Sequence, residues 1–193
     1  MLARRAPVRG FTLVELMVVV ALAAIIIATV APSLRRLIEA QRVRAVNAQL
    51  VTDLQFARSE AATRNAHVRI TFRVAADKSC YSIYTYSNNL NICDCLLDAP
   101  CSVAGFTELK TTRIGFDTKV RVVPIVGQPR EFAFEPLTGS LYTIPVDVAF
   151  VPLTNFVIRT RIDAQRELRT TVGQSGRPVV CAPAGSELRE TPC

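Results

Sequence analysis

Histidine is almost absent from this chain of 193 residues, in which His67 is the only one. The chain has no Ser/His/Asp arrangement in a recognisable context and no glycine-rich loop that would hold a phosphate, so little points to an enzyme. It also lacks a Cys-x-x-Cys pair, and a single histidine is a poor basis for a zinc site. We therefore expect no catalytic residues, no metal and no cofactor, and we expect His67 to be an exposed strand residue.

Lysine is scarce as well, because it occurs only at Lys78, Lys110 and Lys119. Arginine therefore supplies most of the positive charge behind the formal net charge of +7. Three of the arginines lie in the first ten residues, so the rest of the chain is only modestly basic. Such an excess permits anionic partners such as DNA, peptidoglycan or lipid surfaces, but it requires none of them.

A long apolar run, Phe11 to Ala31, contains one ionisable residue, Glu15, five positions after Gly10. A lone carboxylate in a span of about 20 apolar residues costs about 2.5–3.5 kcal/mol on insertion scales, so it calls for a partner. The excess of positive charge before the run places the first residues in the cytoplasm and the rest of the chain outside. The arginines that precede the run are Arg4, Arg5 and Arg9.

The segment Gly10-Phe11-Thr12-Leu13-Val14-Glu15 resembles the class III leader junction of type IV pilins and type II secretion pseudopilins. The resemblance implies that a prepilin peptidase cuts after Gly10 and methylates the new amine of Phe11. It also implies an inner-membrane protein that assembles with other pilins into a filament. In that filament Glu15 would neutralise a positive N-terminus, either its own or that of a neighbouring subunit.

An ordinary secretory signal or an uncleaved anchor would also have a basic start and an apolar stretch. A conventional signal is cut after its apolar run, where Thr29-Val30-Ala31 is the only candidate, and the following Pro32 should hinder that cut. Neither alternative explains Glu15.

The helix is expected to be kinked or loosened at Pro32, because proline removes a backbone hydrogen bond. The resemblance assigns Pro32 to a flexible stretch used in assembly. An amphipathic helix should then continue to about Asn65, since apolar residues recur at steps of three and four. The apolar stripe contains Leu34, Leu37, Ile38, Val43, Val46, Leu50, Leu54, Ala57 and Ala61. The arginines between them are expected on a solvated face: Arg35, Arg36, Arg42, Arg44, Arg58 and Arg64.

From His67 onward the pattern changes to the alternation of half-buried strands. A long N-terminal helix followed by short strands predicts an α+β fold in which the helix packs on an antiparallel β-sheet, as in pilins. The expected segments are a leader at 1–10, a transmembrane and assembly helix at 11–32, an amphipathic helix at 33–66 and a periplasmic β-rich domain at 67–193. Strands are expected near 68–73, 80–86, 113–116, 120–125, 130–134, 146–151, 156–162, 167–172 and 177–181, with a loop at 88–100.

Six cysteines in a domain outside the cytoplasm indicate disulfides, because that compartment is oxidising. Six cysteines allow fifteen pairings. The resemblance implies that Cys181 pairs with Cys193, as in the C-terminal disulfide loop of pilins. The other four should pair among themselves: Cys80, Cys93, Cys95 and Cys101.

Within the pilin-like proteins, three stretches resemble the GspH/FimT branch of minor pilins and minor pseudopilins. They are Leu54–Asn65 at the end of the helix, Phe132–Gly139, and the start of a final strand at Gly176-Arg177. Pro136 to Gly139 is interpreted as a turn. The resemblance implies a structural subunit that initiates or caps a type IV pilus or a type II secretion pseudopilus.

Some FimT-like minor pilins are DNA receptors in natural transformation and carry a Gly-Arg-x-Arg motif near the C-terminus. This chain has Gly176-Arg177-Pro178-Val179, so the second arginine is missing. A DNA-binding alternative would need several arginines of the last strands to converge and bind phosphates. The other interpretation is a solvated strand face with salt bridges to Glu167 or Asp163. The arginines concerned are Arg159, Arg161, Arg166, Arg169 and Arg177.

Overall fold

The computed structural model describes residues 11–86, 92–102, 104–143 and 151–193. The expected leader at 1–10, with Gly10, lies outside the described residues, as does most of the strand expected at 146–151. The chain divides into two compact units, Met1–Ile38 and Glu39–Cys193.

The main helix, α1, spans Leu13–Arg64. At its start, the hydroxyl Oγ1 of Thr12 accepts a hydrogen bond of 3.2 Å from the backbone N–H of Glu15, which satisfies one of the free donors of the first turn. At its end, Asn65 has a positive φ of 47° and the N–H of Ala66 donates to the carbonyl of Ala61. This left-handed cap ends the helix where the sequence predicted.

In the first unit, the apolar side chains of α1 are exposed. The large apolar residues from Phe11 to Ile27 have exposed fractions between 52% and 80%. The first part of the apolar stripe, at Leu34, Leu37 and Ile38, is also exposed. The stripe is therefore buried only from Val43 onward.

No single helix of the described residues is long and apolar enough to cross a membrane. Two segments of α1 meet this criterion of length and composition only when they are taken together as a bent pair. They are Leu13–Thr29 and Ser33–Arg64. The break between them falls at residues 30–32, the place at which Pro32 was expected to interrupt the helix.

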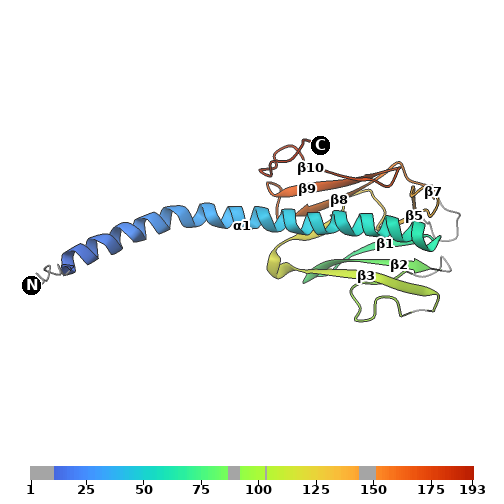
Figure 1. Cartoon of the computed structure of the whole chain (residues 1–193), viewed down its shortest axis with the longest axis horizontal. Coiled ribbons are helices and arrows are strands. Elements are labelled where there is room, and N and C mark those ends of the chain that lie inside the picture. The colour runs from blue at the N-terminus through green and yellow to red at the C-terminus, as the bar shows by residue number, and fades with distance from the viewer. Residues whose placement is uncertain (1–10, 87–91, 103, 144–150) are drawn as a thin grey trace, which may run out of the picture. The chain divides into compact units, whose positions relative to one another are not determined.

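In the second unit, the described residues form ten strands in two antiparallel sheets (Figure 1). The first sheet has the order β3-β2-β1-β5-β6-β7 and the second the order β10-β9-β8-β4. A short 3-10 helix, η1, at Phe116–Thr118 follows β3. The strands are β1 (Val68–Val74), β2 (Lys78–Tyr86), β3 (Phe106–Gly115), β4 (Arg121–Pro124), β5 (Glu131–Phe134), β6 (Leu141–Thr143), β7 (Val151–Pro152), β8 (Asn155–Arg161), β9 (Glu167–Gly173) and β10 (Pro178–Cys181).

The α+β fold class is thus confirmed, with the strands divided between two sheets rather than one. Two strands differ from expectation. The strand β3 begins well before the predicted 113–116, and β6 was not predicted at all. His67 comes just before β1 and is partly buried rather than exposed.

The second half of α1 packs against the inner faces of both sheets (Figure 1). The apolar stripe of this half is buried. Val43 and Leu50 have no exposed surface, and Leu54 is 1% exposed. The two sheets meet through aromatic rings, since Phe156 of β8 lies 4.5 Å from Phe132 of β5 between ring centroids. Burying each of these large side chains contributes about 1.5–3 kcal/mol, so this contact is a main source of stability.

Two buried polar residues of α1 also connect it to the sheets. Asn47 is 2% exposed, and its Oδ1 accepts hydrogen bonds of 2.9 Å from the hydroxyls of Thr160 in β8 and Thr170 in β9. Asp53, also 2% exposed, accepts from residues of the first sheet. Each sheet is therefore fixed to the helix by its own polar contact.

All six cysteines form disulfides: Cys80–Cys95, Cys93–Cys101 and Cys181–Cys193. The last pair is the one that the resemblance to pilins implied, and the other four pair among themselves.

The first two disulfides hold residues 92–102 over the outer face of the first sheet. Arg113 of β3 donates from Nε to the carbonyl of Cys95 at 2.9 Å and from Nη2 to the carbonyl of Leu97 at 2.6 Å. We call residues 92–102 the covering loop.

Candidate functional site

The first candidate site is the start of α1, where the sequence predicted an assembly segment. The backbone N–H of Glu15 donates to the hydroxyl of Thr12, which caps the helix. The carboxylate of Glu15 is therefore not needed to begin the helix. Among the described residues, this carboxylate has no hydrogen-bonding or ionic partner. It lies between exposed apolar side chains such as Val14 and Leu16. A carboxylate in such a setting requires a cation from elsewhere once the helix leaves water.

The second candidate is the outer face of the second sheet, where three of the five expected arginines lie together. In the register of the two strands, Arg159 of β8 lies opposite Arg169 of β9, and Arg161 lies opposite Glu167. Arg121 of β4, which the sequence analysis missed, lies opposite Arg161. This outer arginine face therefore holds four guanidinium groups.

A buried carboxylate partly neutralises the outer arginine face. Glu167 is 5% exposed, and its Oε1 lies 3.0 Å from Nε of Arg169 while its Oε2 lies 3.9 Å from Nη1 of Arg161. The guanidinium of Arg121 stacks on the ring of Phe116, at 4.3 Å from the ring centroid. The arrangement matches the alternative interpretation of a strand face with salt bridges to Glu167.

The other two arginines do not join this face. Arg166 forms ion pairs with Asp163 and with Glu39 of α1, so its charge is compensated locally. Arg177 lies in the turn before β10 and lines a different cavity. The convergence that the DNA-binding alternative would need is therefore found for only three of the five arginines, and the structure gives no support to a DNA-binding surface built from them.

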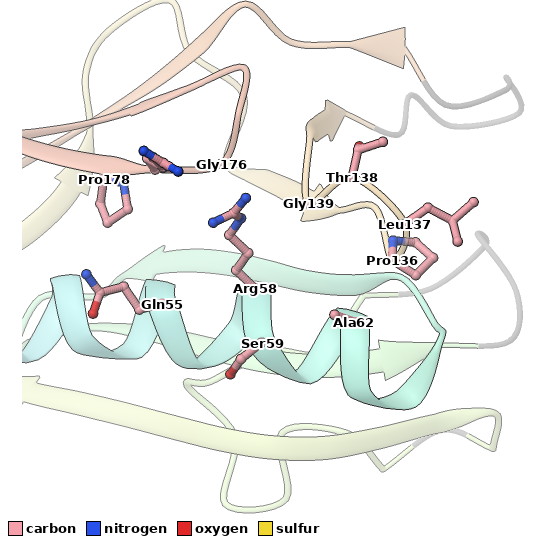
Figure 2. A pocket seen from close by; sticks show the side chains of 11 residues that line it. Gln55, Arg58, Ser59, Ala62, Pro136, Leu137, Thr138, Gly139, Gly176 and Pro178 are labelled. Atoms are coloured by element: carbon pink, nitrogen blue, oxygen red, sulfur yellow. The ribbon is translucent and has the colours of Figure 1, made fainter.

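The cavity that includes Arg177 is an open cleft of about 560 Å³ between α1 and two turns (Figure 2). We call it the arginine cleft. No aspartate or glutamate is among its described lining residues. These are Gln55, Arg58, Ser59 and Ala62 of α1, Pro136, Leu137, Thr138 and Gly139 of the first turn, Gly176 and Arg177 of the second turn, and Pro178 at the start of β10.

Arg58 forms the base of the arginine cleft. Its side chain extends from α1 toward the gap between Gly139 and Gly176 (Figure 2). The Nε atom of Arg58 is buried and has no hydrogen-bond partner among the described residues. The sequence analysis placed Arg58 on a solvated helix face, and the structure corrects this because the two turns cover it.

Two glycines make room for Arg58. Gly139 and Gly176 have positive φ values of 69° and 74°, which residues with a side chain rarely adopt. A Cβ on Gly139 would lie 2.5 Å from Nε of Arg58, and a Cβ on Gly176 would collide with the carbonyl oxygen of Gly139. The sequence showed these glycines only as turn and strand-start residues, and nothing local connected them to Arg58.

Glu135, which directly precedes Pro136 of the cleft, is occupied by its own turn. Its carboxylate accepts hydrogen bonds from the N–H and the hydroxyl of Thr138 and from the N–H of Leu137. These hydrogen bonds, first of all that from the Thr138 hydroxyl, lower the pKa of Glu135.

Burial lowers the pKa of His67, and the nearby charge of Glu135 partly opposes this effect.

Two models of known protein families match this chain. The prokaryotic N-terminal methylation motif matches residues 5–31, and the model of the type II transport protein GspH matches residues 47–176, more than half of the chain. The chain belongs to the GspH family. A search of curated proteins and a search of solved structures found no match.

Membership in the GspH family makes this chain a type IV pilin-like protein of the GspH/FimT type, a minor pilin or pseudopilin subunit. GspH-type pilins are structural subunits and not enzymes. They assemble with other pilins and are substrates of a prepilin peptidase, and the methylation motif with its apolar helix indicates membrane anchoring. The methylation motif covers the segment that contains the first candidate site, the start of α1.

Proposed function

We propose that this GspH-family chain is a minor subunit that initiates or caps a type IV pilus or a type II secretion pseudopilus. In this proposal a prepilin peptidase removes residues 1–10 by cutting after Gly10, and residues 11–32 anchor the chain in the inner membrane. Residues 33–66 form the amphipathic part of the helix, and residues 67–193 lie on the periplasmic side.

The observation that supports this proposal most strongly is the unpartnered carboxylate of Glu15 among exposed apolar side chains. Apolar surface on this scale is not stable in water and requires lipid or other apolar helices. Within a bundle of such helices, a carboxylate is tolerated only beside a cation. The methylated amine of Phe11, in the same chain or a neighbour, is the cation that cleavage after Gly10 would create.

The test is a Glu15→Ala variant expressed in cells that make the filament. We expect the variant to enter the membrane at the normal level, because the substitution makes the helix more apolar. Its incorporation into filaments should fall by about a hundredfold or more, since an amine left unpaired in the bundle costs about 3–5 kcal/mol. Immunodetection in membrane and filament fractions measures both quantities.

A matched control is Glu190→Ala, which removes an exposed carboxylate from the second unit and should change neither fraction. Normal filament incorporation of Glu15→Ala would contradict the proposed assembly mechanism. Loss of the variant from the membrane fraction would contradict the separation of anchoring from assembly.

A further inference from the structure

The arginine cleft has features that an assembly role of the N-terminal helix does not explain. Two arginines line it, Arg58 at the base and Arg177, which is exposed, at the rim. Among the described residues, neither guanidinium has a hydrogen bond or an ion pair. By contrast, Arg166 and Arg169 are both compensated by carboxylates. The cleft therefore carries positive charge without an internal partner.

The position of Arg58 is fixed before any ligand arrives. The Arg58 side chain lies so close to Gly139 and Gly176 that a Cβ on Gly139 would lie 2.5 Å from its Nε and one on Gly176 would lie 3.0 Å from it. A guanidinium that is already held loses less conformational entropy when it binds, and its planar donors match the two oxygens of a carboxylate. Because Nε is buried, a ligand in the open cleft would bind the terminal guanidinium nitrogens of Arg58.

The walls of the cleft indicate what surrounds the bound anion. Pro136, Leu137 and Pro178 provide apolar surface, and the side chain of Leu137 is 84% exposed. Thr138 and Gln55 provide polar groups at the edge (Figure 2). The cleft is open to solvent, and its volume of about 560 Å³ lies in the size range of ligand-binding sites. The combination suits a carboxylate with apolar neighbours.

We propose that the arginine cleft binds an aspartate or glutamate side chain on an extended segment of a neighbouring protein subunit. Arg58 receives the carboxylate at the base, Arg177 adds charge at the rim, and Leu137 contacts an apolar residue beside the acidic one. The identity of the partner as a filament neighbour rests on the proposed function, whereas the recognition of a carboxylate does not.

A nucleic acid fits this cleft less well. Duplex DNA is bound by rows of exposed cations that follow its phosphates. Arg58 is recessed and the cleft walls are apolar at Pro136 and Pro178. A single peptide strand can enter such a site, while a duplex reaches only the rim at Arg177.

The test uses NMR spectra of the full isotopically labelled chain in detergent micelles, at low ionic strength. The probe is the blocked peptide acetyl-Leu-Glu-Leu-amide, and its matched control is acetyl-Leu-Gln-Leu-amide, which has the same shape without the charge. We expect the glutamate peptide to shift the Nε–Hε signal of Arg58 in a saturable manner, and the glutamine peptide to have no such effect.

Two variants locate the binding. Arg177→Gln and Arg58→Gln should each weaken binding by about tenfold or more, because each removes a charged hydrogen-bond donor. Arg177 is exposed, so its variant keeps the test valid if Arg58→Gln does not fold. The matched control is Arg42→Gln, an exposed arginine on the same helix, which should leave the affinity unchanged.

Several results would overturn the proposal. These are equal shifts with both peptides, no binding at millimolar peptide, unchanged affinity in Arg177→Gln, or an equally strong response of Arg58 to sodium acetate alone. A short DNA duplex that displaces the peptide with a steep salt dependence would assign the cleft to nucleic acid instead. This test measures peptide binding and not filament incorporation, so its failure would leave the proposed role of Glu15 intact. Failure of the Glu15→Ala test would likewise leave the binding of a carboxylate in the cleft intact.

Discussion

Asp53 shows how a single buried residue connects the helix to the first sheet. Its carboxylate accepts hydrogen bonds of 2.7 Å from the hydroxyl of Tyr81 and from Nζ of Lys110, and of 3.2 Å from the hydroxyl of Thr112. Burial raises the pKa of Tyr81 well above its usual range, so the hydroxyl remains a neutral donor. Every oxygen of this buried carboxylate is thus provided with donors.

We predict that Asp53→Ala lowers the free energy of unfolding by about 2–3 kcal/mol, because it leaves two buried hydroxyls without their acceptor. Lys110 is 42% exposed and can turn to water, which limits the loss. Urea denaturation of the fragment 39–193 measures the change. Glu60→Ala on the same helix removes only the i,i+4 pair with Arg64 and should cost about 0.5 kcal/mol or less. Equal losses in both variants would contradict the importance of the buried contact.

His67 should make stability depend on pH near neutrality. Burial lowers the pKa of His67 from its ordinary value of 6.5, so the folded state takes up a proton less readily than the unfolded state. Above about pH 6.5 the neutral imidazole contributes to the free energy of unfolding. This contribution is lost as the pH falls through that value toward the lower pKa of the folded state.

We therefore expect the urea midpoint of the fragment 39–193 to fall slightly between pH 7 and pH 5.5, and the decrease to be smaller in His67→Gln. The lowered pKa of Glu135 acts in a separate window, since its stabilisation is lost only as the pH falls below its ordinary value of 4.5. Parallel pH profiles of the two proteins above pH 5.5 would show that His67 makes no such contribution.

At the scale of elements, the covering loop and the C-terminal tail are both closed by disulfides of similar span. Cys80–Cys95 has a sequence separation of 15 and Cys181–Cys193 one of 12. Chain entropy alone therefore predicts similar contributions, about 3 kcal/mol each. The surroundings differ, because Cys80 and Cys95 are fully buried while Cys193 is exposed.

We predict that replacing Cys80 and Cys95 by alanine lowers the melting temperature of the fragment 39–193 more than replacing Cys181 and Cys193. Both cysteines of the first pair are fully buried, so their replacement leaves space in a packed region and also removes the covalent connection between the covering loop and β2. Thermal denaturation under oxidising conditions compares the two double variants. A larger effect of the tail disulfide would mean that the covering loop is held mainly by contacts such as those of Arg113.

The elements that the sequence predicted well are those whose buried side is apolar. The stripe from Val43 to Ala61 and the alternation in β8 and β9 follow this rule. The strand β3 was mostly missed because two of its inward residues, Lys110 and Thr112, are polar. They face the carboxylate of Asp53 instead of apolar side chains, so the alternation that marks a strand is absent from that segment.

The candidate sites were predictable to different degrees for a similar reason. Glu15 stands out because it interrupts an apolar run, and Asn47 could have been found because it occupies a position of the buried stripe between Val43 and Leu50. The arginine cleft was not predictable, since Arg58 meets Gly139 and Gly176 only after the chain has folded. Contacts between distant turns leave no periodic signal in the sequence.

For the whole molecule, the two units have opposite surface chemistry. In the first, the apolar side chains from Phe11 to Ile27 are exposed and Glu15 is their only ionisable neighbour. In the second, the apolar side chains form a core, and buried polar residues such as Asn47 are satisfied. Folding therefore completes the second unit alone, and the first unit needs an apolar environment made by lipid or by other subunits.

That requirement explains why the basic leader would have to be removed before assembly. If the leader stayed attached, its arginines would precede Phe11 directly and would enter the apolar bundle, at a cost of about 2.5–3.5 kcal/mol for each charge at the centre of a membrane. Cleavage after Gly10 replaces them by a single amine that Glu15 can neutralise. We predict that Gly10→Val blocks this cleavage, so that the chain keeps residues 1–10, lacks the methyl group on Phe11 and is not found in filaments.

Intact mass spectrometry of the purified chain measures the leader and the methyl group directly. The matched control is Gly173→Ala, a glycine of β9 with open space around it and no positive φ, which should be cut and methylated normally. A wild-type chain that retains its leader in cells that process their own pilins would contradict the proposed cleavage. A Gly10→Val chain that enters filaments uncut would show that the bundle tolerates the leader arginines, and the pairing of Glu15 with a free amine would then lose its physical basis.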